Sequence, residues 1–388
     1  MGSEPAVAYI AEGKLYLKDG TSPARLLDSP FVQGILDRVS RARQRNDWKS
    51  GTWQLSRALM PIPNAGAVGE VRRVQYTGVS RGEGDGQLVY AIDTDHVGGL
   101  FSFDIKDGYE RRLLHRNQFR ANDLVRHPID GTLAFSLRQQ DGSACIATLS
   151  AEGKGLKEVT EGDSVDEAPS WIGSEHVLLF QSAGIGRDAH GLPRVLGPYA
   201  IQRLDFDRGD LTTVAEDEHF DYLTARQSSD GAIYFIRRPY QPHPRISPGR
   251  ALLDVLLFPY RVARAIVHFL NFFSIMFAQK PLLTAGGPPK QGPDPRYLML
   301  WGKMIDAEKA LNASKKTGGT SLVPPTWELV RRDSAGVEEV LARAVLAFDL
   351  PPAGGVVFTN GSTISYRRPS GEISQIATGR MIERVTSL

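Results

Sequence analysis

The sequence has very little cysteine and no large excess of charge. Cys145 is the only cysteine among 388 residues, so an internal disulfide is impossible and a reducing, cytoplasmic setting fits. The 46 basic residues are nearly balanced by 44 acidic ones, a net charge of +2 that argues against nucleic acid as a partner. We therefore expect a cytoplasmic globular protein in which Cys145 is a buried structural thiol.

The chain also lacks clear signs of secretion and of catalysis. Residues 1–20 contain no basic segment followed by an apolar one, so we expect no secretory signal. The eight histidines form no closely spaced pair on a helix, and we predict no metal and no cofactor. The Gly-x-Ser-x-Gly pattern at 78–82 precedes a Gly-rich turn and a strand instead of a helix, which predicts a hairpin loop and no catalytic residue.

Turn residues and short alternating strands are abundant, with 39 Gly and 24 Pro in the chain. The segment 121–165 reads as a lead-in that ends in a turn at Asp130-Gly131, followed by three strands separated by turns at Asp141-Gly142 and Glu152-Gly153. Similar units begin near residues 6, 74, 121, 166, 221 and 342. The first unit lacks a strand and a spare strand follows at 381–388, which predicts a ring closed by its own termini. We predict an all-β fold: a six-bladed β-propeller forming a single domain over 1–388.

The units resemble the TolB-like propeller family, whose repeats are similar to those of WD40 proteins. The resemblance rests on Pro169-Ser170-Trp171, on residues 127–131, on Ala134-Phe135, and on Ser228-Ser229-Asp230-Gly231. It covers about two thirds of the chain and implies the six-bladed fold. It leaves the function open, because propellers carry many roles.

Two stretches, 29–66 and 240–325, depart from the repeat, and we predict both to be helical insertions. In the first, Ser29 and Pro30 suit a helix start. An apolar stripe follows at helical spacing, formed by Phe31, Val32, Ile35, Leu36 and Val39. This helix would pack on the outside of the propeller, or contact a partner or an acidic surface.

The second insertion lies within the fifth blade, between the strand at 232–238 and the strand at 326–334. Its eleven Lys and Arg residues against four Asp and Glu give it a net charge of +7. An apolar helix is predicted over 250–279, with Arg261 and Arg264 on its narrow polar stripe, and another helix over 295–312. So wide an apolar surface must be buried against something.

Several burial partners are possible for the 250–279 helix. A membrane span is disfavoured, because both ends of the insertion return to one blade. The helix could lie in the plane of a membrane, dock into a partner protein, or pack on its own propeller. The predicted partner- or membrane-binding residues are Arg261, Arg264, Phe269, Phe272, Phe273, Met276 and Phe277.

Together these features predict a non-enzymatic, protein-interaction scaffold whose insertion docks a partner protein. It could belong to a bacterial multi-protein system with ATPase and von Willebrand-type partners. One alternative is a propeller held peripherally at the inner membrane by the 250–279 helix. A second is a hydrolase or lyase that uses the central channel, which requires titratable groups to converge at one mouth of the ring.

Overall fold

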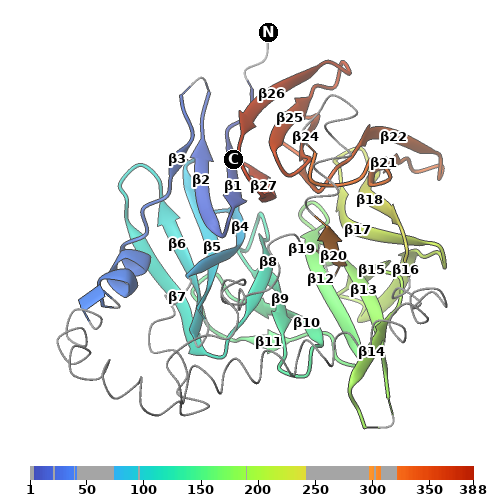
Figure 1. The fold of residues 1–388 in the computed structure, drawn as a ribbon, viewed down its shortest axis with the longest axis horizontal. Helices are drawn as coiled ribbons and strands as arrows, with labels where there is room; N and C mark the ends of the chain where they lie inside the picture. The colour runs from blue at the N-terminus through green and yellow to red at the C-terminus, as the bar shows by residue number, and fades with distance from the viewer. Residues whose placement is uncertain are drawn as a thin grey trace, which may run out of the picture. The chain divides into compact units, whose positions relative to one another are not determined.

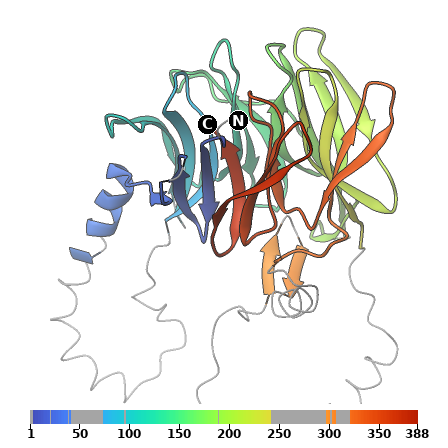
Figure 2. The ribbon, with the colours of Figure 1, turned by 90° about the horizontal axis from the view of Figure 1, so that it is seen from above.

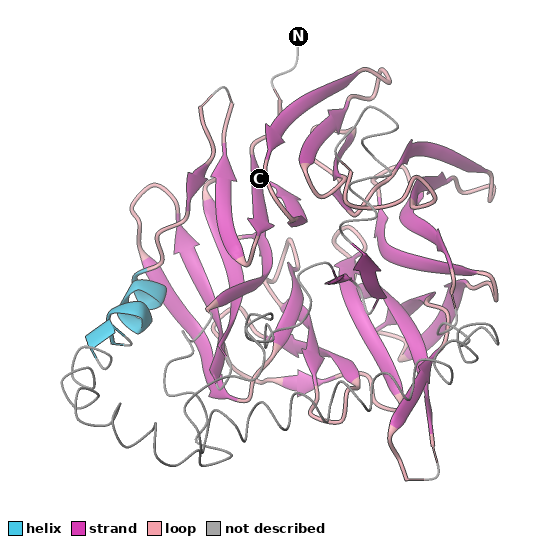
Figure 3. Ribbon diagram, in the orientation of Figure 1, coloured by secondary structure: helices cyan, strands magenta, loops and turns pink. Residues whose placement is uncertain are grey.

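The computed structural model describes residues 4–20, 22–38, 40–41, 74–94, 97–188, 190–241, 297–300, 303–306 and 321–388. Within these residues the regular structure is almost entirely β-strand (Figure 3), which confirms the predicted all-β class. Contacts divide the chain into two compact units, Met1–Tyr240 with Lys309–Leu388, and Gln241–Glu308. No helix in the described ranges is long and apolar enough to span a membrane.

The first sheet brings together both ends of the chain. Tyr9 of β1 lies opposite Val385 of β27 in an antiparallel pair, and Figure 2 shows these strands side by side. The predicted spare strand at 381–388 thus belongs to the sheet that begins the chain. In order across the sheet, the strands are β27 (Ile382–Ser387), β1 (Val7–Ala11), β2 (Lys14–Lys18) and β3 (Arg25–Leu26).

Two further sheets are simple antiparallel meanders of four strands, coloured cyan and red in Figure 1. The first consists of β4 (Gln75–Arg81), β5 (Gln87–Thr94), β6 (Val97–Asp104) and β7 (Glu110–Asn117). The second consists of β23 (Ala347–Asp349), β24 (Val356–Thr359), β25 (Thr363–Arg367) and β26 (Ile373–Thr378).

A nine-stranded sheet contains two antiparallel groups joined by one parallel bridge, between Ala144 and Val165. The first group is β8 (Ala121–Arg126), β9 (Leu133–Arg138), β10 (Ala144–Leu149) and β11 (Lys157–Glu158). The second is β12 (Ser164–Trp171), β13 (Val177–Arg187), β14 (Pro193–Leu196), β15 (Ala200–Asp205) and β16 (Asp210–Ala215). The predicted turns at Asp130-Gly131 and Asp141-Gly142 connect strands of the first group, and both glycines have positive φ.

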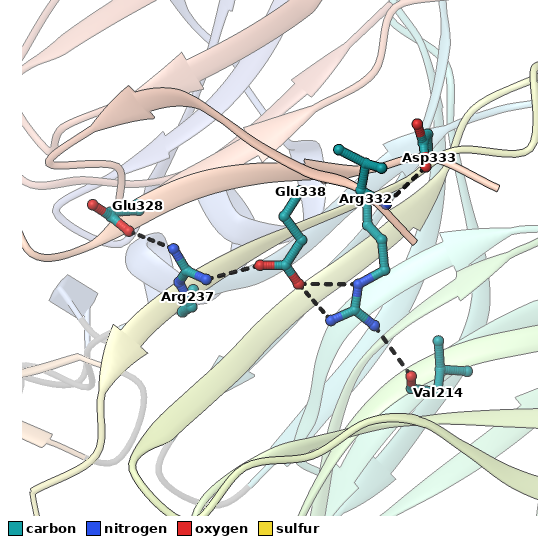
Figure 4. A network of polar contacts seen from close by, with 7 residues as sticks. Val214, Arg237, Glu328, Arg332, Asp333 and Glu338 are labelled. Carbon is teal, nitrogen blue, oxygen red and sulfur yellow. Dashed lines mark hydrogen bonds and ion pairs between the residues drawn. The ribbon is translucent and has the colours of Figure 1, made fainter. Parts of the chain in front are cut away.

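The remaining large sheet pairs strands that are far apart in the sequence. It contains β17 (Phe220–Gln227), β18 (Ile233–Pro239), β21 (Glu328–Arg332) and β22 (Glu338–Arg343), with β18 directly against β21. Figure 4 shows the charged residues on this sheet: Arg237 bridges Glu328 and Glu338, and Arg332 also binds Glu338. Charged groups such as these on an outer strand discourage pairing with another chain.

Strands β8, β12 and β17, each the first of its group of strands, share a distortion at the same register position. In each of them two residues lie opposite one on the neighbouring strand. Asp123, Ala168 and Thr224 are the non-glycine residues with positive φ at these bulges. A bulge bends and twists its strand, so these strands curve in the same way at matching positions.

The hydrophobic core lies between successive sheets and follows the two-residue period of the strands. In β5, Leu88, Tyr90 and Ile92 pack toward β1 and β2, whereas Val89 and Ala91 pack toward β9 and β10. Both faces of β5 are therefore buried, as in a strand with a sheet on either side. Cys145 belongs to the second of these clusters and is buried, as predicted.

The described part of the first insertion is a helix over residues 30–38 that continues at 40–41. Ser29 caps it as predicted, since its Oγ accepts the Val32 N–H at 3.2 Å. Phe31 packs on Phe101 of β6, with ring centroids 4.6 Å apart, so the helix lies against the β4–β7 sheet. Leu36 of the predicted stripe stays largely exposed, and residues 42–66 lie outside the described residues.

The second compact unit contains a β-hairpin where a helix is predicted over 295–312. Strands β19 (Tyr297–Leu300) and β20 (Lys303–Asp306) pair antiparallel, so the helical prediction for 240–325 is wrong here. Leu, Met and Lys, which are frequent in this stretch, also suit a helix. The two-residue Trp301-Gly302 connection suits a hairpin, and Gly costs about 1 kcal/mol within a helix.

Candidate functional site

The first strands of several sheets end around one polar pocket of about 340 Å³. We call it the arginine pocket and define it by its polar lining residues, Ser80, Arg81, Glu83, Arg126, Arg226 and Asp349. Arg81 ends β4, Arg126 ends β8, Asp349 ends β23, and Arg226 is the next-to-last residue of β17. The fold therefore collects at one place charged residues that the sequence separates by up to 268 positions.

A hydrogen-bond network joins four of these strands at the pocket. Arg81 donates from Nε to the Ser387 carbonyl oxygen at 2.6 Å and from Nη2 to the Ser387 hydroxyl at 2.9 Å. The backbone N–H and the hydroxyl of Ser387 both donate to Oδ2 of Asp349 at 2.7 Å. Asp349 then faces Arg226, whose Nη1 lies 3.3 Å from its Oδ1. The network fixes β4, β27, β23 and β17 relative to one another.

Positive charge exceeds negative charge in the pocket. The lining residues include three arginines, Arg81, Arg126 and Arg226, and two acidic residues, Glu83 and Asp349. Burial lowers the pKa of Arg81; Asp349 opposes this effect and Arg226 adds to it. Nε of Arg226 is buried and has no hydrogen-bond partner within the described ranges. An anionic group entering the pocket would supply that partner and balance the charge.

Ser80 and Arg126 connect neighbouring sheets at the pocket wall. The backbone N–H of Arg126 donates to Oγ of Ser80 at 3.0 Å. Ser80 is the serine of the Gly-x-Ser-x-Gly pattern, and β4 turns directly into β5, with Gly82 N–H donating to the Gln87 carbonyl at 2.7 Å. The predicted hairpin loop is thus confirmed, because no helix follows the serine.

A second cavity, of about 730 Å³, borders the arginine pocket and shares Arg81, Gly82 and Glu83 with it. It is lined by the β4–β5 loop at 82–86 and by basic residues of the first two sheets, among them Lys18, Arg25 and Lys106. Asp19 and Asp85 also line this cavity, so its basic residues are largely balanced by acidic ones.

The predicted binding residues and the arginine pocket are different sets. Arg261, Arg264, Phe269, Phe272, Phe273, Met276 and Phe277 lie outside the described residues, as does the whole 250–279 helix. Sequence reasoning missed the pocket, although a signal exists. Arginine closes the first strand of three units in similar contexts, Val-Ser-Arg81, Leu-Val-Arg126 and Thr-Ala-Arg226.

Comparison with known proteins yields structural matches alone. No family model and no curated protein matches the sequence. The chain matches the crystal structure of TolB from Acinetobacter baumannii with a TM-score of 0.52 and 11% identity, over 98% of this chain and 66% of that one. It matches the crystal structure of the tricorn protease with a TM-score of 0.48 and 11% identity, over 99% of this chain and 34% of that one. A nidogen/laminin complex matches with a TM-score of 0.47 at 8% identity, over 99% of each chain. The chain thus spans less than two thirds of the TolB length.

The matches correct the prediction of a non-enzymatic chain. Matched structures include the tricorn protease, oligogalacturonate lyase, prolyl endopeptidases and a puromycin hydrolase. Because this fold occurs in enzymes, the lack of a catalytic motif in the sequence does not exclude catalysis. The prediction that the chain is not an enzyme is therefore wrong. The arginine pocket combines groups from strands that are distant in the sequence, so a local motif search carries little information about it.

At such low identity these likenesses establish the fold and nothing about activity. They agree with the stacked antiparallel sheets and with the resemblance noted in the repeats. The chain has a TolB-like β-propeller fold.

Proposed function

We propose that this chain is a binding protein whose arginine pocket receives carboxylate groups from an extended segment of a partner protein. The observation that carries the proposal is the convergence of Arg81, Arg126 and Arg226, from three different sheets, on one pocket. Guanidinium groups match carboxylates with paired, charge-assisted hydrogen bonds, and such bonds gain strength where water is partly excluded. The pocket volume of about 340 Å³ is large enough for one or two side chains.

The proposal includes a six-bladed ring closed by the chain termini. Supporting it, β27, β4, β8, β12, β17 and β23 each lie beside the next, and β23 also lies beside β27. The pairing of β27 with β1 would then close the ring within the first sheet. In such a ring the arginine pocket lies at one mouth of the central channel, where a peptide could enter end-on.

Isothermal titration with a hexa-aspartate peptide tests the pocket, with a hexa-asparagine peptide as the uncharged control. We expect saturable binding of the acidic peptide, weakened by salt. Arg226→Met and Arg126→Met should each weaken it about 10-fold or more, since a hydrogen bond to a charged group contributes about 1.5–3 kcal/mol. Arg111→Met, on the exposed face of β7, is the matched control and should bind like the unaltered chain. Equal loss in all three variants would refute a specific pocket.

A second candidate function, catalysis in the channel, is favoured by one observation. Titratable groups converge at the pocket, which is what the hydrolase or lyase alternative requires. The same peptides, recovered after incubation and weighed by mass spectrometry, separate the two functions. Intact peptide supports binding alone, whereas cleavage that Arg226→Met abolishes supports an enzyme.

The basic insertion at 240–325 remains a proposed second contact, for a partner protein or for a membrane surface. Liposome flotation tests the membrane alternative by comparing the full chain with a variant lacking residues 247–283. Flotation of the full chain alone, on anionic lipid, supports a membrane contact. Failure of both to float excludes the membrane contact and leaves two proposals for this segment, a partner protein or packing on its own propeller.

A further inference from the structure

Three side chains with metal-binding atoms meet at the turns of neighbouring strand groups. His127 follows β8 and Asp130 lies in the turn to β9, whereas His176 precedes β13 in the turn after β12. One ligand atom from each lies within 4.8 Å of the others. We call these three residues the turn cluster, and we propose that they bind a zinc ion.

The distances within the turn cluster suit a tetrahedral ion. Nδ1 of His127 lies 2.8 Å from Oδ1 of Asp130, and Nε2 of His176 lies 3.1 Å from Oδ2 of Asp130. Ligands about 2.1 Å from a tetrahedral zinc ion are themselves about 3.4 Å apart. The ion would take the place of the protons that the carboxylate shares with the two imidazoles. It would also displace the Asp130 N–H, now 3.3 Å from Nδ1 of His127.

The surroundings hold the two imidazoles in place. His127 is 1% exposed and packs edge-on against Trp171, with ring centroids 4.9 Å apart. On its other nitrogen, His176 faces a second carboxylate, with 3.6 Å between its Nδ1 and Oδ1 of Asp207. A carboxylate behind a metal-binding histidine orients the ring and raises its basicity, and it is a usual companion of zinc sites.

The donor set also points to the kind of site. Two imidazoles and one carboxylate are common zinc ligands, and three protein ligands leave the fourth position for water or another molecule. The side chains of Asp130 and His176 are 42% and 48% exposed, so the open position would face solvent. This is the arrangement of a reactive or ligand-binding zinc ion, in contrast to a closed structural one.

Bound zinc would also fix the wall of the arginine pocket. Arg126 and Pro128, the sequence neighbours of His127, both line that pocket. The ion would tie the β8–β9 turn to the β12–β13 turn, which belong to different strand groups. The zinc site does not depend on the proposed peptide binding and can be tested separately.

The experiment is a zinc titration of the full, tag-free chain after chelation, followed by calorimetry, with stoichiometry from native mass spectrometry. We expect one zinc ion per chain and a melting temperature that rises with zinc concentration. His176→Asn and Asp130→Asn should bind zinc at least about 10-fold more weakly and lose the melting shift. His190→Asn, an exposed histidine in the turn after β13, is the matched control and should retain both.

Circular dichroism of each variant shows whether it folds. If His176→Asn fails to fold, Asp207→Asn replaces it, with an expected 10- to 100-fold loss of affinity through the orientation of His176. Absence of binding in excess zinc would overturn the proposal. So would binding that is unchanged in His176→Asn and Asp130→Asn, because the ion would then lie elsewhere on the chain.

Discussion

The buried pair of Arg238 and Asp221 gives the sharpest prediction about stability. Both side chains are 1% exposed, and Nε of Arg238 lies 2.7 Å from Oδ2 of Asp221. The guanidinium also stacks over Trp327 at 4.7 Å, and the other oxygen of Asp221 accepts the Tyr199 N–H at 3.2 Å. Arg238→Met keeps much of the side-chain volume but leaves the carboxylate buried without its cation.

The expected loss in the free energy of unfolding for Arg238→Met is about 3–5 kcal/mol, because the buried Asp221 carboxylate loses the guanidinium with which it is paired. Adding Asp221→Asn removes that charge while keeping an oxygen for the Tyr199 N–H. The double variant should therefore recover about 2 kcal/mol or more of the loss. The coupling free energy between the two substitutions measures the cost of keeping the Asp221 carboxylate buried without the Arg238 guanidinium.

Urea unfolding followed by tryptophan fluorescence measures these changes, with Trp327 under the guanidinium as a local reporter. The matched control is the exposed pair of Arg331 and Asp230, whose nitrogen and oxygen lie 2.9 Å apart. Arg331→Met should cost at most about 1 kcal/mol. A loss below about 1 kcal/mol in Arg238→Met, or a double variant less stable than the single one, would refute the argument from burial.

Three further predictions concern single positions. Gly98→Ala should destabilise the fold far more than Gly184→Ala in urea unfolding, because a Cβ at 98 would lie 1.7 Å from a backbone carbonyl oxygen whereas one at 184 meets nothing within 4 Å. Cys145 should resist a thiol reagent at pH 8 until urea unfolds the chain, since burial raises its pKa to about 11; rapid labelling of the folded chain would contradict this. Hydrogen bonds from a serine hydroxyl and an arginine of β21 lower the pKa of Asp230 to about 2. The unaltered chain should therefore be more stable than Asp230→Asn above about pH 4, and this difference in the free energy of unfolding should vanish near pH 2 in acid unfolding curves.

Local patterns predicted the repeating strands because those patterns have local causes. The Asp-Gly turns at 130–131 and 141–142 and the alternation in β5 follow from backbone preferences and from burial on two faces. The cap at Ser29 is equally local, since it needs only the N–H three residues ahead. The sequence did not predict the hairpin of β19 and β20, because its residues also suit a helix. The structure pairs Leu300 with Lys303, which gives a hairpin in place of the predicted helix.

The sites could not be predicted in the same way, because their residues meet through the fold. Arg81 and Arg226 reach one pocket from separate sheets, and each reads locally as an ordinary charged residue at a strand end. His127 and His176 are 49 residues apart, close to one repeat, and a search for closely spaced ligands overlooks them. The two histidines do not occupy matching positions of their units, because the His127 N–H donates to Thr132 as the Ile172 N–H donates to Val177. A search at the repeat period would therefore not find them either.

The pairing of β1 with β27 has a consequence for the order of events during synthesis. Val7 leaves the ribosome 380 residues before Ser387, its eventual neighbour in the sheet. At about 5–20 residues per second, β1 waits about 20–75 s with one backbone edge unpaired. A strand with an unpaired edge can form hydrogen bonds with a strand of another chain, so the nascent chain is most prone to such mispairing during translation. The pairing of β27 with β1 would then end that exposure.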